Sequence, residues 1–100
     1  MKLINIKHRS DEVSFRQAVL QGLGRDQGLF FPEKLETLGD VTGLLQEPFV
    51  PRSVAILQHL LGDEVAESTL REMVVSAFDF PVETPEITPG VRALEPVSYT

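Results

Sequence analysis

Residues 13–32 read VSFRQAVLQGLGRDQGLFFP, and this stretch decides how the first part of the chain folds. Ser14, followed three residues later by Gln17, matches a capping box, in which two side chains satisfy free backbone N–H groups at the start of a helix. Apolar residues then recur at helical spacing, so we expect a helix with one buried stripe. The stripe consists of Phe15, Ala18, Val19, Gly22 and Leu23.

Glycines gather where this stripe ends. We predict that Gly24 closes the helix in a left-handed conformation and that Gly28 supplies a second positive φ, with Asp26 bonding to local backbone. Residues 29–31 should then run extended into Pro32, because the residue before a proline avoids the helical region. A phosphate-binding loop would instead precede a helix, where free N–H groups face the anion. The stretch therefore indicates a helix end, a tight turn and a short strand.

The remaining sequence predicts one more strand near the start, three further helices and a terminal linker. The expected ranges are 2–7 for the strand, 41–46 for a short helix capped by Asp40, Pro51 to Gly62 for a helix that is apolar on most sides, about 66–81 for an amphipathic helix closed by Phe80-Pro81, 82–90 for an extended linker, and 91–97 for a last short strand.

These patterns predict a mostly helical α+β fold, a small domain of about three to four helices with a few short strands. We expect the domain to span residues 1–81, with residues 82–100 forming a Pro-rich linker and a short strand. A chain of 100 residues is long enough for one domain with one modest core.

Composition excludes several function classes. The formal net charge of −6 argues against nucleic acid as a partner, because phosphate backbones require a basic face. Cysteine is absent, which excludes thiolate nucleophiles and zinc–thiolate sites within these residues. The sequence has no apolar run of the ~20 residues that span a bilayer, and its start does not resemble a signal peptide. We therefore expect no membrane partner and a cytoplasmic location.

Few side chains are candidates for catalysis. His8 and His59 are the two imidazoles, and no carboxylates surround either one at the spacing of a metal site. The acidic pairs at 11–12 and 63–64 are expected at helix starts, as solvated caps. Arg25, beside the glycines, is the most informative arginine to mutate, although a solvent-exposed charge at a helix end is the simpler interpretation. Composition and spacing thus predict no catalytic, cofactor or metal residue in this chain.

Residues 13–32 resemble the N-terminal domain of the threonine synthase family, whose signature is close to S-F-x-x-A-V-x-x-G-L-x-x-D-G-G-L-F-x-P. The resemblance covers the chain to about Pro81. It continues in the opening MKLINIK, in RSVAIL from Arg52, in GDEV from Gly62 and in AFDFP from Ala77. The matching positions of the first stretch are Ser14, Phe15, Ala18, Val19, Gly22, Leu23, Asp26, Gly28, Leu29, Phe30 and Pro32.

This resemblance implies a pyridoxal-phosphate enzyme of the fold-type II group, which converts O-phospho-L-homoserine and water into L-threonine and phosphate. In the family, the lysine that binds the cofactor follows an E-L-F-H-G-P-T-x-A-F-K-D segment just beyond this domain. The closing residues EPVSYT do not match that segment, and Lys2, Lys7 and Lys34 lie outside any such motif. We therefore expect a chain truncated before the reactive centre and inactive by itself, with pyridoxal phosphate bound elsewhere in the full-length enzyme.

The expected partner is the remainder of the same enzyme, which would pack against an apolar face of this domain. Phe30, Phe31 and part of the helix at 54–61 are the predicted interdomain face. A free-standing helical module that binds another protein is the alternative, and composition alone favours it. The residues expected to have structural roles are Ser14, Gln17, Gly24, Gly28 and Pro32.

Overall fold

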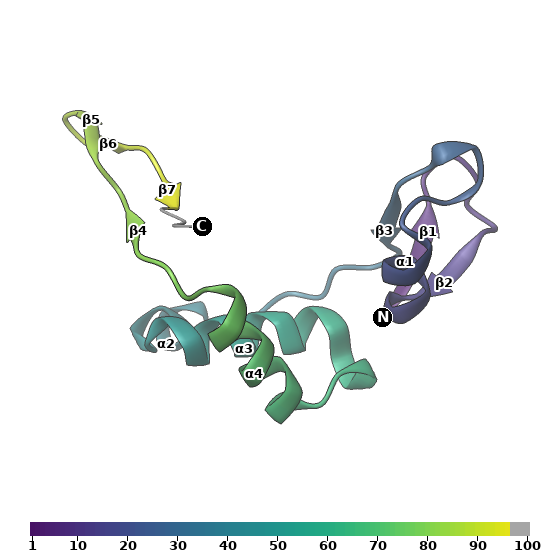
Figure 1. The fold of residues 1–100 in the computed structure, drawn as a ribbon, viewed down its shortest axis with the longest axis horizontal. Helices are drawn as coiled ribbons and strands as arrows, with labels where there is room; N and C mark the ends of the chain where they lie inside the picture. Colours follow the sequence, from purple (N-terminus) through teal and green to yellow (C-terminus); the bar gives the residue numbers. More distant parts are fainter. Residues whose placement is uncertain (97–100) are drawn as a thin grey trace.

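The computed structural model describes residues 1–96, which form two lobes and an arm (Figure 1). Residues 1–32 form the β-lobe, residues 40–78 form the helical lobe, and residues 82–96 form the C-terminal arm. The described part of the chain is elongated, with extents of 45 × 31 × 30 Å. Its four α-helices and short strands make an α+β fold, as predicted.

The β-lobe contains a three-stranded antiparallel sheet in the order β2-β1-β3. The central strand β1, Lys2–Asn5, pairs with β2, Glu12–Ser14, on one side and with β3, Phe30–Pro32, on the other. Strand β2 occupies the place where the acidic pair at 11–12 was expected to start a helix, because Glu12 pairs with β1 instead.

The register of β3 against β1 places the two adjacent phenylalanines on opposite faces of the sheet. Phe30 lies opposite Asn5, and Phe31 lies opposite Ile4. Since directly opposed residues share a face of the sheet and neighbours alternate, Phe30 belongs to the inner face with Leu3 and Asn5, and Phe31 belongs to the outer face. Only the inner face is covered within the β-lobe, by helix α1 and the glycine loop, residues 22–28.

Helix α1, Phe15–Gln21, begins with both hydrogen bonds of the expected capping box. The Ser14 hydroxyl accepts from the Gln17 N–H at 3.2 Å, and the Gln17 side-chain oxygen accepts from the Ser14 N–H at 2.9 Å. The helix ends at Gly22, with φ +80°, and not at the predicted Gly24, whose φ is −81°. Gly22 is the first residue after the helix that adopts a positive φ without a Cβ penalty, so the helix stops there.

The expected burial of the α1 stripe is also wrong. No residue of α1 is buried by the described residues, and the Val19 side chain remains 62% exposed. The helix contacts β1 and β2, and Phe15 at its start packs against the helical lobe, but Val19, Gly22 and Leu23 of the stripe remain exposed.

The helical lobe is built on the packing of α3, Phe49–Leu61, against α4, Glu67–Ala77. Helix α3 starts two residues before Pro51, the predicted first residue. It ends at Gly62, as predicted. Helix α4 ends three residues before the predicted Phe80-Pro81, because Phe78 leaves the helical conformation and packs edge-to-face on Phe49 at a centroid distance of 5.6 Å. The core consists of Val54, Leu61, Leu70 and Val74.

The short helix α2, Val41–Gln46, starts as predicted, with the Asp40 carboxylate accepting from the Gly43 N–H at 2.9 Å. Its other end is held by Arg52 of α3, which donates from Nη2 to the carbonyls of Leu45 at 3.1 Å and Glu47 at 2.7 Å. A guanidinium at a helix C-terminus satisfies free carbonyls and opposes the negative end of the helix dipole.

Glu64 joins the two lobes. It lies in the 3-10 turn η2, Gly62–Glu64, between α3 and α4. Its carboxylate accepts from the Phe15 N–H and from the Met1 ammonium. The expected solvated cap is therefore a cap on a different helix, α1, since Phe15 offers a free N–H in the first turn.

The C-terminal arm is more regular than the linker predicted for it. Strand β4, Val82–Glu83, pairs with β7, Glu95–Pro96, and β5, Glu86–Thr88, pairs with β6, Val91–Arg92. The single strand expected at 91–97 is thus two short strands, and position 97 lies outside the described residues. None of the helices in residues 1–96 has the length and hydropathy needed to cross a membrane.

Candidate functional site

A buried polar cluster at the tip of the β-lobe is the most organised polar feature in residues 1–96. Its centre is Asn5, which is 0% exposed. The Asn5 amide donates to the Arg25 carbonyl at 3.0 Å and to the Asp11 carboxylate at 3.3 Å, and its oxygen accepts from the Lys7 N–H at 2.9 Å. Three segments of the chain are therefore tied together by one carboxamide, whose burial is compensated by its hydrogen bonds.

Gly24 and Gly28 lie directly against this carboxamide, and this contact explains the glycines. Neither has a positive φ; Gly28 has φ −69°, and the positive values fall at Asp26 and Gln27. A Cβ at Gly24 would lie 2.5 Å from Asn5 Nδ2, and one at Gly28 would overlap the Asn5 oxygen. The two glycines are needed for close approach, so their predicted left-handed conformations are wrong. The Asn5 side chain occupies the space beside both glycines.

His8 lies on the outer side of the same cluster, between Arg25 and Asp26. Its Nδ1 is 2.8 Å from Arg25 Nη2, and its Nε2 is 2.5 Å from Asp26 Oδ2. Because a guanidinium only donates, Nδ1 must accept, and the ring proton lies on Nε2, facing the carboxylate. Both ring nitrogens are thus occupied. A histidine base needs one nitrogen free for its substrate, so this His–Asp pair fits a structural role.

The Asp26 carboxylate thus bonds to His8, whereas a bond to its own local backbone was expected. Lys7 adds a further link, with its ammonium 2.9 Å from the Asp26 carbonyl. Sequence reasoning missed Asn5; its one signal was an amide two positions after Leu3, on the same face of the strand.

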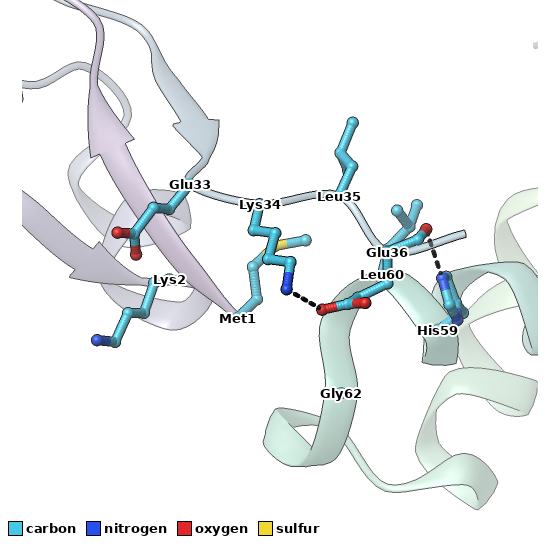
Figure 2. A pocket seen from close by; sticks show the side chains of 9 residues that line it. All are labelled: Met1, Lys2, Glu33, Lys34, Leu35, Glu36, His59, Leu60 and Gly62. Carbon is cyan, nitrogen blue, oxygen red and sulfur yellow. Dashed lines mark hydrogen bonds and ion pairs between the residues drawn. The ribbon is translucent and has the colours of Figure 1, made fainter. Parts of the chain in front are cut away.

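A hollow of about 360 Å³ lies where the β-lobe, the segment at 33–36 and α3 meet (Figure 2). Lys34 Nζ is 3.3 Å from Glu36 Oε1, and His59 Nε2 donates to the Glu36 carbonyl at 2.9 Å. The Lys34 and Glu36 side chains are 78% and 66% exposed. These two charges are paired with each other and solvated, so neither is poised for catalysis.

The predicted interdomain residues are separated. Phe31 is half-exposed on the outer face of the sheet, and Phe30 is partly buried on the inner face. Pro32 ends β3 opposite Leu3. Within residues 1–96, no three His, Asp or Glu side chains are grouped so as to hold a metal ion.

Comparison with known proteins gives one consistent result. The family described as "Threonine synthase N terminus" matches residues 3–78. The chain is 48% identical over 95 residues to a threonine synthase of Haemophilus influenzae and 44% identical over 97 residues to that of Escherichia coli; each match covers 95% of this chain. The crystal structure of threonine synthase from Escherichia coli superposes with a TM-score of 0.85 over 95% of this chain. The chain spans 22% and 23% of the length of these two relatives.

Proposed function

The chain belongs to the threonine synthase family, and from this premise we propose that it is the N-terminal domain of an enzyme that converts O-phospho-L-homoserine and water into L-threonine and phosphate. The observation that carries the proposal is the match along nearly the whole chain, in sequence at 44% identity and in structure at a TM-score of 0.85. The relatives are more than four times longer, so the activity is proposed for a full-length protein.

Pyridoxal phosphate supplies the electron sink for this kind of chemistry when it is bound. Residues 1–96, the described part of the chain, do not fit that cofactor. Its phosphate needs converging donors, and its aldehyde needs an available lysine. Lys2 and Lys34 are 69% and 78% exposed in surface ion pairs, and Lys7 bonds to the Asp26 carbonyl. We therefore propose that the cofactor is held by other parts of the enzyme and that these 100 residues are inactive alone.

The contribution proposed for this domain is structural, in a cytoplasmic enzyme. Residues 1–81 would form the domain, and residues 82–100 would lead toward the catalytic part. The family match ends at residue 78, and every residue from 82 to 92 is exposed, which supports a boundary near 81.

An assay on the full reading frame tests the function. The full-length protein, supplied with pyridoxal phosphate and O-phospho-L-homoserine, should release phosphate and L-threonine in equal amounts. The 100-residue chain, assayed in parallel, should release neither and should give no aldimine absorbance with the cofactor. A stoichiometric aldimine band from the 100-residue chain would contradict the proposed location of the reactive centre. A reading frame that stops after Thr100 would contradict the enzyme and favour the interaction module.

A further inference from the structure

An apolar groove of about 440 Å³ lies between the β-lobe and the helical lobe. One wall comes from α1 and the inner face of the sheet, including Phe15, Val19 and Phe30, and the other comes from Leu57 and Leu60 of α3. None of the side chains that line it is charged. The groove is therefore chemically different from the hollow in Figure 2, which is lined by several charged side chains.

The groove is apolar surface that residues 1–96 leave open to solvent. Val19 is 62% exposed, Leu29 is 51% exposed and Leu60 is 36% exposed. The sequence of α1 has the amphipathic pattern of a helix with a buried stripe, yet none of its residues is buried. A contiguous apolar surface of this kind is typical of a site that contacts another protein surface.

Two other ways of covering the groove are disfavoured. A phosphorylated amino acid would bring several charges to walls whose side chains are all uncharged, and burying unpaired charge is costly. Closure of the lobes onto each other is disfavoured by the Escherichia coli structure, which superposes on 95% of this chain with a TM-score of 0.85. The matched region is only 23% of that longer chain, and the two lobes have the same arrangement there.

We propose that the groove is filled by apolar side chains from the part of the full-length enzyme that follows residue 100. This inference rests on the proposed function and names the surface through which the domain joins the enzyme. The relatives supply the occupant, since more than three quarters of their length lies outside the match. The docking surface consists of the α1 stripe, Phe30 and the exposed edge of α3, and it leaves out Phe31, on the opposite face of the sheet.

Cysteine labelling of the full-length protein tests the docking surface. Residues 1–100 contain no cysteine, so one thiol can be introduced at Val19→Cys and, as a matched control, at Leu45→Cys on α2. Both positions are 62% exposed in the domain by itself. Each variant is treated with a maleimide, native and in urea, and the labelled peptide is quantified by mass spectrometry. For each variant, the native labelling rate is divided by the rate in urea. This ratio should be at least roughly tenfold lower for V19C than for L45C.

Equal native labelling of V19C and L45C overturns the proposal. Protection of V19C that disappears on dilution also overturns it, because a second copy would then cover the groove. Leu29→Cys, 51% exposed in the same groove, gives an independent reading where V19C disturbs folding. The readout does not depend on activity. An active enzyme with an exposed V19C refutes only the docking surface, and an inactive protein with a protected V19C refutes only the enzyme.

Discussion

The carboxylate of Glu64 caps α1 through the backbone N–H of Phe15, with its two oxygens at 3.1 and 3.3 Å from the nitrogen. The two residues are 49 positions apart, and they belong to different lobes. Glu64 Oε2 also lies 3.1 Å from the Met1 ammonium. A first-turn N–H has no partner within its own helix, so the position of one lobe depends on an acceptor supplied by the other.

Replacing Glu64 should therefore weaken the coupling between the lobes. We expect Glu64→Ala to lower the free energy of unfolding by about 1–2 kcal/mol, because its side chain is only 25% exposed and it accepts charge-assisted hydrogen bonds. Urea unfolding followed by circular dichroism measures this loss. Asp63→Ala, at the neighbouring carboxylate, is the control and should change stability by less than about 0.5 kcal/mol. Equal effects of the two variants would contradict the cap.

Asn5 should be intolerant of substitution. Asn5→Ala leaves the Lys7 N–H without its partner and removes the side-chain donor to the Arg25 carbonyl, which keeps only the Gly28 N–H, so we expect a loss of about 2–4 kcal/mol in urea unfolding. Asn5→Asp keeps the volume and the acceptor but removes both donors and adds a charge beside Asp11. It should also be strongly destabilising. Stability close to wild type for Asn5→Asp would mean that the two donated hydrogen bonds contribute little at this position.

The contact of Gly28 with Asn5 predicts an energetic coupling. Gly28→Ala has an acceptable φ of −69° but places its Cβ in the Asn5 carboxamide, so we expect a cost of about 2–3 kcal/mol. In an Asn5→Ala background much of that cost should disappear, giving a coupling energy of about 1–2 kcal/mol in a double-mutant cycle. Gly22→Ala is strained by its φ of +80° but has no neighbour near its Cβ. The stability cost of Gly22→Ala should be the same in the wild-type and Asn5→Ala backgrounds. An equal cost of Gly28→Ala in the two backgrounds would contradict the coupling.

Arg52 should hold the end of α2. In Arg52→Met the carbonyls of Leu45 and Glu47 lose their donor, and α2 contains no buried residue that could keep it folded. We expect amide hydrogen exchange across α2 to accelerate and stability to fall by about 1–2 kcal/mol. Arg71→Met removes only an exposed ion pair with Glu67 and should cost less than about 0.5 kcal/mol. Unchanged exchange across α2 in Arg52→Met would contradict the role of this arginine.

Sequence reasoning predicted the elements whose signals are local. The capping box at Ser14, the Asp40 cap and the helix end at Gly62 each depend on atoms within one helical turn. The apolar periodicity of α3 and α4 likewise predicted the helices that form the core. For these features, a short window of sequence contains the signal that predicts them.

The polar cluster depends on contacts that no short window contains. The neighbouring residues in the sequence predict a positive φ at Gly24 and Gly28. In the structure, these positions are glycine because the carboxamide of Asn5, on β1, lies directly against them. The separation of Phe30 from Phe31 follows from the register with β1, which the doublet alone does not reveal. Tertiary contacts thus decided the features that were predicted wrongly or missed.

The β-lobe is also nearly complete within the first third of the chain. Its last backbone link, from the Glu33 N–H to the Lys2 carbonyl at 2.9 Å, closes the sheet around Asn5. On the ribosome, every partner of the Asn5 side chain is present as soon as this unit emerges, whereas Glu64 follows ~30 residues later, roughly 2–6 s at ordinary synthesis rates of about 5–20 residues per second. The hydrogen bonds around Asn5 can therefore form before Glu64, the residue that caps α1 from the helical lobe, has emerged from the ribosome.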